Sequence, residues 1–227
     1  MYKNILFSLL TLVFLTSCFS LWHDTQWENI SQWVWESQDR IQIFALGDSL
    51  TAWYGLPIED AYPSVLQTLL DEHHANYRVI NAWVSGNTSA ELLWRLDWVM
   101  SEAGSWDIAI LVIGWNDGLR GMNLWELESN ILSIIDILRQ KDMRIVLWGM
   151  QIPPNLWLRY TRDFEALYKN IARNNRDIYF IDFFLEWVVA DPALNLSDMI
   201  HPNRLWYEII AQNVYNFLAS NWLVWSR

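Results

Sequence analysis

The sequence predicts an α/β fold, a flavodoxin-like three-layer α/β/α sandwich around a central parallel sheet of five strands. First, strand-like apolar runs alternate with helical segments from residue 41 onward, which is typical of parallel sheets with helical crossovers. Second, the run 108–113 is apolar throughout, as expected of a strand that helices cover on both faces. Third, 53% of the 227 residues are hydrophobic, which is enough for the core of one such domain.

The expected elements follow the chain in alternation. Each strand is a short run of apolar residues bounded by polar residues or glycine, and the strands are expected at 41–46, 77–82, 107–113, 144–150 and 178–182. Each helix repeats apolar residues at intervals of three and four, and the helices are expected at 59–74, 89–102, 124–140, 159–173 and 206–220. Neither an internal repeat nor a second domain is visible, so residues 41–221 are predicted to form a single domain.

The N-terminal region predicts export. Lys3 precedes the apolar run 5–15, which is too short to span a bilayer comfortably and is typical of a signal peptide, here residues 1–17. The only cysteine, Cys18, follows directly, and residues 15–18 resemble the lipobox of bacterial lipoproteins. That resemblance implies acylation of Cys18 and a membrane-anchored protein outside the cytoplasm. The alternative is secretion with cleavage near Ser17 or Ser20.

The polar residues 18–40 are expected to form a tether between the anchor and the domain. The formal net charge of −11 excludes binding to nucleic acid as a main function, because a phosphate backbone is itself anionic. His, Cys, Asp and Glu residues show no metal-ligand spacing, so neither a metal nor another cofactor is predicted.

Four polar motifs lie where strands end or where the last helix begins. Residues 47–50 (Gly-Asp-Ser-Leu), 85–88 (Ser-Gly-Asn-Thr) and 114–117 (Gly-Trp-Asn-Asp) follow the first three strands. Residues 198–202 (Asp-Met-Ile-His-Pro) precede the last helix. Because parallel strands bring their carboxyl ends to one edge of the sheet, these motifs are expected to meet there.

The residue types in these motifs suit nucleophilic catalysis. The hydroxyl of Ser49 is a weak nucleophile that needs a nearby base, and His201 is suited to that role because its pKa lies near neutrality. Asp198, three residues earlier, is placed to accept the other imidazole N–H and to fix the tautomer. Ser49, His201 and Asp198 are therefore the predicted catalytic triad.

Together the four motifs resemble the conserved blocks of the SGNH (GDSL-type) hydrolases, in order and spacing, from about Ile43 to Leu218. Further similarity at 116–121, 153–155 and 198–203 is to the bacterial branch of thioesterase–lysophospholipases and arylesterases. The resemblance implies a serine esterase that hydrolyses carboxylic esters or thioesters, such as aryl esters or lysophospholipids, through an acyl-enzyme on Ser49. The alternatives are a carbohydrate O-deacetylase with the same triad and an inactive surface-binding lipoprotein.

The resemblance also implies three donors for an oxyanion hole: the backbone N–H groups of Ser49 and Gly86 and the side-chain amide of Asn116. Asp48 and Asp117 are expected to hold loops through hydrogen bonds, and Asn87, Thr88 and Asp117 are candidates to brace the hole. The segment 118–123 is the expected acyl-side loop. The residues considered for the acyl pocket are Met150, Ile152 and Pro154, although core packing explains the first two equally well.

Tryptophan and glycine occur in unusual numbers. The chain has 17 Trp and 8 Gly, whereas an average composition of about 7% would give about 16 Gly. Six tryptophans stand where the family usually has glycine, namely Trp53, Trp83, Trp115, Trp157, Trp187 and Trp206, and four more lie in the tether at Trp22, Trp27, Trp33 and Trp35. One hypothesis is that the codon UGA specifies glycine in the source organism and was translated as tryptophan.

Not every tryptophan fits this hypothesis. Trp98 suits the family as it stands. If Trp83 and Trp115 are tryptophan in the native protein, their indoles would be expected to block the acyl pocket or to strain their turns. The alternatives are a tryptophan-rich protein with repacked loops and a carbohydrate binder with exposed indoles.

Overall fold

The computed structural model describes residues 40–48, 57–152, 158–182 and 203–225. The predicted signal peptide and tether, with Cys18, lie outside the described residues, as do Ser49, Asp198 and His201. Residues 41–227 belong to one compact unit. Within the described ranges, no helix combines the length and the apolar character needed to cross a membrane.

Five parallel strands form the sheet, in the order β2-β1-β3-β4-β5. The strands are β1 (Ile41–Gly47), β2 (Tyr77–Trp83), β3 (Ile108–Val112), β4 (Arg144–Trp148) and β5 (Tyr179–Ile181). This order confirms the predicted flavodoxin-like sheet, in which the chain starts near the centre and reverses direction next to β1. The β1–β2 and β1–β3 registers pair Gly47 with Trp83 and with Val112, so the three strands end level.

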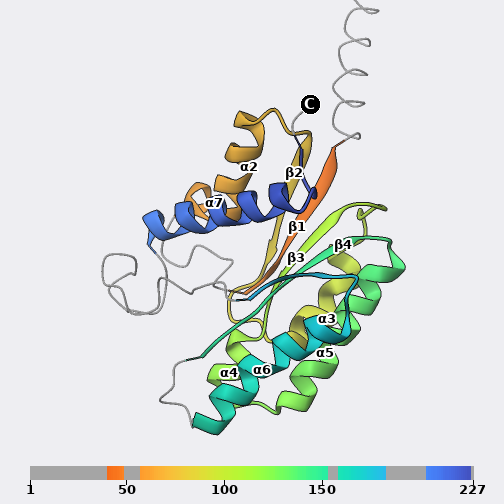
Figure 1. The fold of residues 1–227 in the computed structure, drawn as a ribbon, viewed down its shortest axis with the longest axis vertical. Coiled ribbons are helices and arrows are strands. Elements are labelled where there is room, and N and C mark those ends of the chain that lie inside the picture. Colours follow the sequence, from red (N-terminus) through yellow and green to blue (C-terminus); the bar gives the residue numbers. More distant parts are fainter. Residues whose placement is uncertain (1–39, 49–56, 153–157, 183–202, 226–227) are drawn as a thin grey trace, which may run out of the picture. The chain divides into compact units, whose positions relative to one another are not determined.

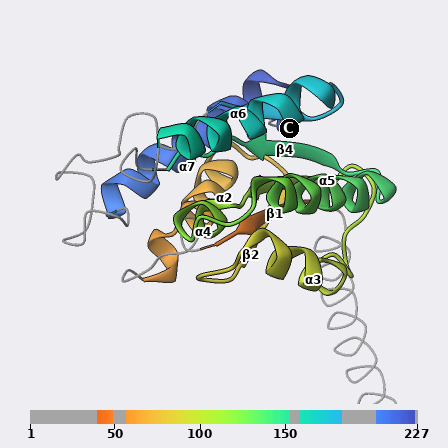
Figure 2. The same ribbon diagram turned by 90° about the horizontal axis from the view of Figure 1, so that it is seen from below.

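Helices cover both faces of the sheet, which completes the three layers (Figures 1 and 2). Helices α2 (Tyr62–Glu72) and α7 (Arg204–Ser220) pack together on one face. The other face carries α3 (Ser89–Val99), α5 (Leu124–Gln140) and α6 (Leu158–Asn174). All five residues of β3 are buried between these layers, as the apolar run predicted.

One predicted helix has the wrong bounds, and one short helix was not predicted. The region expected as one helix at 59–74 is a 3-10 turn, η1 (Ile58–Asp60), followed by α2. Ala61 between them is extended, and Pro63 lies in the first turn of α2, where its missing N–H leaves no bond unmade. The short helix α4 (Trp115–Leu119) was not predicted, because five residues are too few to show a helical period.

The backbone at Trp83 and Trp115 shows none of the strain expected there. Trp83 ends β2, and Trp115 is the first residue of α4 and is only 6% exposed. The positive φ of that turn falls on Gly114, at +107°, where a Cβ atom would collide with the Tyr168 hydroxyl. The motif therefore needs glycine at its first position and accommodates an indole at its second.

Two other tryptophans do adopt a conformation that favours glycine. Trp106 has φ of +73°, and Trp222 has φ of +57°. Trp222 follows the C-cap of α7 in a Schellman motif, in which Leu223 N–H donates to Leu218 C=O and Trp222 N–H donates to Ala219 C=O. Both indoles are mostly exposed, so little packing offsets the backbone cost.

Replacing either Trp106 or Trp222 by glycine is expected to stabilise the chain. Each change should raise the free energy of unfolding by about 1 kcal/mol, because an L-residue in the left-handed region costs roughly that amount. Urea unfolding followed by circular dichroism measures the effect. Trp94→Gly is the matched control: this exposed indole lies inside α3, where glycine should cost about 0.5 kcal/mol. Destabilisation by all three changes would contradict the assignment of strain to Trp106 and Trp222.

Candidate active site

Three loops meet at the carboxyl edge of the sheet because β1, β2 and β3 end level. They begin at Asp48, Val84 and Ile113, and they carry three of the four motifs that the sequence singled out. The structure therefore brings together Asp48, Gly86 and Asn116, which lie far apart in the sequence. The triad residues Ser49, Asp198 and His201 lie outside the described residues.

Gly86 sits in a tight turn closed by a hydrogen bond of 3.1 Å from Asn87 N–H to Val84 C=O. Its φ is +80°, which suits the third position of a type II turn and favours glycine there. The space beside it is open, since a Cβ atom would meet no atom within 4 Å. Among the residues that the structure describes, no acceptor receives the Gly86 N–H.

The Asn116 amide lies between the first and second loops. Its Nδ2 donates to Asp48 Oδ2 at 3.0 Å and to the Asn87 carbonyl oxygen at 3.1 Å. An amide nitrogen carries two protons, so both are engaged. The side chain is thereby fixed in orientation, next to the residue that directly precedes Ser49.

Two buried carboxylates hold these loops, as the sequence led us to expect. Asp48 is fully buried and accepts the bond from Asn116. Asp117 accepts bonds from the Ser89 N–H at 2.9 Å and from the Ser89 hydroxyl at 2.6 Å. The Ser89 hydroxyl in turn accepts a bond from Asn130 Nδ2 at 3.0 Å. Asp117 thus joins the third loop to the start of α3.

The start of α3 is capped in a way that supports the Gly86 turn. Thr88 and Glu91 form a capping box, with Thr88 N–H donating to the Glu91 carboxylate at 2.7 Å. These hydrogen bonds from Thr88, backbone first, lower the pKa of Glu91. Arg120 adds a further contact, donating to the Gly86 carbonyl oxygen at 3.1 Å.

The negative charge of Asp48 influences two buried tyrosines. Burial raises the pKa of Tyr168, and the nearby Asp117 and Asp48 carboxylates raise it further. Burial and then Asp48 also raise the pKa of Tyr207. Both phenols therefore stay protonated, and the Tyr168 hydroxyl donates to the Ile113 carbonyl oxygen at 2.7 Å.

The residues considered for an acyl pocket divide into two groups. Met150 and Ile152 are buried in the core, and Ile152 packs against Gly118 so closely that a Cβ atom there would clash. Pro154 lies outside the described residues. The segment 118–123, the expected acyl-side loop, is held by a hydrogen bond of 2.7 Å from the Tyr160 hydroxyl to the Met122 carbonyl oxygen. Among the residues that the structure describes, no group of three His, Cys, Asp or Glu side chains is arranged to hold a metal ion.

Sequence reasoning found Asp48, Gly86, Asn116 and Asp117 through their motifs, but it did not single out Arg95. Arg95 lies in the middle of α3, outside all four motifs, and bonds to Gly47 at the end of β1 and to Asn87 in the second loop. Its only sequence signal is a lone basic residue on a helix, which resembles many solvent-exposed positions.

Comparison with known proteins decides the family. The family model described as "GDSL-like Lipase/Acylhydrolase family" matches residues 45–209, most of the chain. The chain belongs to this family. It is accordingly a serine hydrolase of the SGNH type that acts on carboxylic esters, and the family resemblance seen in its sequence is confirmed.

Its curated relatives are esterases. An arylesterase of Vibrio mimicus is 33% identical over 186 residues, which is 80% of this chain and 92% of the relative. Esterase TesA of Pseudomonas aeruginosa is 33% identical over 173 residues, covering 76% and 85% of the two chains. Thioesterase 1/protease 1/lysophospholipase L1 of Escherichia coli is 32% identical over 163 residues, covering 71% and 76%.

Solved structures agree with these relationships. The crystal structure of TesA superposes with a TM-score of 0.73 at 32% identity and covers 79% of this chain and 98% of that one. The psychrotrophic esterase EstA from Pseudoalteromonas sp., inhibited by monoethylphosphonate, gives a TM-score of 0.74 at 29% identity, with coverage of 80% and 98%. Both similarities extend over the whole α/β/α domain.

Removing the Asp117 carboxylate should destabilise the folded protein. We expect Asp117→Ala to lower the free energy of unfolding by about 2–3 kcal/mol, because the buried Ser89 N–H and hydroxyl lose their acceptors. Thermal unfolding measures the effect. Asp97→Ala, an exposed carboxylate on the same helix as Ser89, should stay within about 0.5 kcal/mol of the parent. Equal effects of the two changes would contradict the anchoring role of Asp117.

Proposed function

We propose that this hydrolase cleaves carboxylic esters, and acyl thioesters, through an acyl-enzyme on Ser49. The observation that carries the proposal is the convergence of Gly86 and Asn116 beside Asp48, the residue that directly precedes Ser49. Gly86 has an N–H that no described residue accepts, and Asn116 has an amide held in a fixed orientation. Preorganised donors of this kind stabilise the oxyanion of a tetrahedral intermediate.

In the proposed mechanism, His201 removes the proton of the Ser49 hydroxyl as its oxygen attacks the ester carbonyl carbon. The carbonyl oxygen becomes an oxyanion that accepts bonds from Ser49 N–H, Gly86 N–H and the Asn116 amide. When the intermediate collapses, the alcohol or thiol leaves with the proton from His201, and Ser49 keeps the acyl group. Water, activated by His201, then releases the carboxylic acid, while Asp198 holds the imidazole in place throughout.

To bind the oxyanion, the Asn116 amide must turn one of its two N–H donors away from its present acceptor. Its two protons serve Asp48 and the Asn87 carbonyl in the structure, so an oxyanion is bound by sharing or exchanging one of these bonds. The remaining bond keeps the amide oriented. Asp48 and Asn87 therefore act as the resting partners of the proposed oxyanion donor.

We propose short acyl esters, aryl esters and lysophospholipids as the substrate class. The names of the relatives support this: they are an arylesterase, an esterase and a thioesterase with lysophospholipase activity. A carbohydrate O-deacetylase would use the same triad. The inactive binding lipoprotein is disfavoured because Ser49, Asn116, Asp198 and His201 are all present.

We also propose that Cys18 carries the lipid anchor that places the enzyme on a membrane outside the cytoplasm. Support comes from the sequence alone: the only cysteine follows directly on the predicted signal peptide, residues 1–17. Bacterial lipoproteins carry more than one acyl chain on this cysteine, and more than one chain is enough for stable anchoring.

The tryptophan excess supports a third proposal, that several of these positions are glycine in the native protein because UGA specifies glycine there. The positive φ at Trp106 and Trp222 adds support, since these positions favour glycine on conformational grounds. The codons of the gene and the peptide masses of the protein from its native source test this directly. UGG codons at Trp106 and Trp222 would refute it for those residues.

Ser49→Ala should abolish both ester hydrolysis and labelling by a fluorophosphonate probe. Asn116→Ala should lower kcat per active site about 10²- to 10³-fold, the usual cost of one oxyanion donor. Ser105→Ala, an exposed serine in a turn, is the matched control and should behave as the parent. Retained labelling in Ser49→Ala would refute the assignment of Ser49 as the nucleophile.

Comparing a lysophospholipid, an aryl ester and an acetylated glycan as substrates separates the esterase from the deacetylase.

Cys18→Ser should abolish acylation of the mature protein. In a bacterial host fed an alkyne fatty acid, the parent should incorporate the label and remain in the membrane fraction, whereas the variant should not. A parent protein without label, released into the medium, would instead show secretion with cleavage near Ser17 or Ser20.

A further inference from the structure

We infer that Arg95 is a positioning residue for the esterase reaction, which holds the oxyanion-hole loops in register. It lies on α3, away from the proposed triad in sequence and outside the four family motifs. Its guanidinium bridges the loop after β2 and the end of β1, with Nε donating to Asn87 Oδ1 at 2.8 Å and Nη2 donating to the Gly47 carbonyl oxygen at 3.4 Å. The inference rests on the proposed roles of Gly86 and Asn116.

The two bonds of Arg95 close a ring of contacts around the site. From Gly47 the chain leads to Asp48, which accepts a bond from Asn116; Asn116 donates to the Asn87 carbonyl. The Asn87 side chain then accepts the bond from Arg95, which returns to Gly47. This ring joins the loops after β1, β2 and β3, and each of these loops carries one of the three proposed oxyanion donors.

Arginine suits this role better than a neutral residue. The guanidinium is planar and presents its donors in a rigid fork, so its two bonds fix the separation between the loop after β2 and the end of β1. Arg95 is half-buried, and burial lowers its pKa, although arginine stays charged. Its bonds to Asn87 and Gly47 are therefore charge-assisted, and such bonds are stronger than neutral ones.

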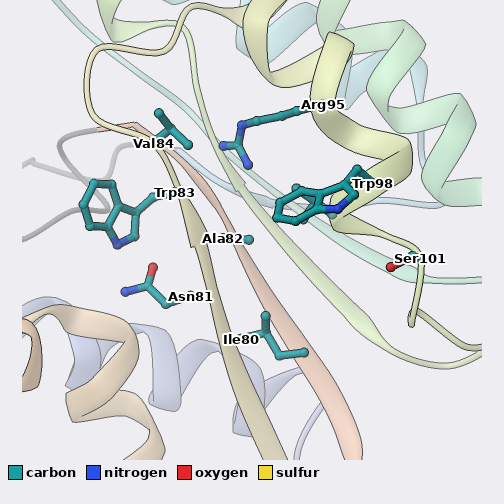
Figure 3. Close-up of a pocket in the computed structure, with 9 residues that line it drawn as sticks. Ile80, Asn81, Ala82, Trp83, Val84, Arg95, Trp98 and Ser101 are labelled. Atoms are coloured by element: carbon teal, nitrogen blue, oxygen red, sulfur yellow. The ribbon is translucent and has the colours of Figure 1, made fainter.

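Arg95 also forms part of the wall of a cavity of about 540 Å³ along β2 and α3. Figure 3 shows its side chain reaching from α3 toward the end of β2, beside Val84, with Ala82 and Trp98 further along the cavity. Removing the side chain would leave space that opens into this cavity. A guanidinium ion is small enough to enter there and replace the lost group.

The test compares Arg95→Gln and Arg95→Lys with Arg78→Gln, an exposed arginine on β2. We expect both Arg95 variants to lower kcat about 10- to 100-fold, because small displacements of catalytic donors have costs of this size. KM should stay within about twofold, since the substrate is still bound. Titration with a fluorophosphonate counts the active sites, so kcat is expressed per active site.

A merely structural role would reduce the fraction of active sites and the Tm but leave kcat per active site unchanged, and that result would overturn the inference. Asn87→Ala should reproduce the loss, and combining it with Arg95→Gln should add little to it. Arg95→Ala should regain activity when guanidinium chloride is added at concentrations far below unfolding, but not with sodium chloride. Additive losses, or no difference between the two salts, would argue against the ring.

The design separates this inference from the proposed function. If Asn116→Ala leaves kcat unchanged, the oxyanion assignment itself fails. If Asn116→Ala lowers kcat as expected while Arg95→Gln matches Arg78→Gln, only the positioning role of Arg95 is wrong.

Discussion

The level pairing of β1 with β2 and β3 is the constraint on which the site depends. Gly47 lies opposite both Trp83 and Val112, so three chain reversals begin at the same height of the sheet. The peptide hydrogen bonds of a parallel sheet fix this register, and helices on both faces bury it. A shift of one residue would move every side chain to the opposite face and would separate Asp48 from Asn116.

The need of two buried carboxylates for hydrogen bonds determines how the polar groups at the end of the sheet are arranged. Asp48 and Asp117 are fully or almost fully buried, and a buried carboxylate is stable only when hydrogen bonds compensate for the lost water. Each draws donors from a different loop, namely Asn116 for Asp48 and Ser89 for Asp117. Preorganisation of the proposed oxyanion hole thus follows from the same bonds that stabilise the fold.

Backbone conformation decides where glycine is needed in this chain. Gly86 and Gly114 take positive φ in the loops of the site, and Gly114 also lacks space for a Cβ atom. Trp115, next to Gly114, has a helical backbone and a buried indole, so its place in the family motif tolerates a large side chain. Conformation alone therefore does not account for every tryptophan at a family glycine position. Among the described tryptophans, positive φ values identify Trp106 and Trp222, on the surface, as the ones whose backbone favours glycine.

The sequence by itself determined the α/β class, the parallel sheet and the motif residues Asp48, Gly86, Asn116 and Asp117, because hydrophobic period and local motifs are written in short stretches of chain. It also identified the family. Only the tertiary structure decided that Asn116 faces Asp48, that Met150 and Ile152 belong to the core, and that Arg95 closes the ring. The hydrogen bonds join residues that lie 8 to 68 positions apart, and the core positions depend on packing between layers. A short sequence motif does not predict contacts of either kind.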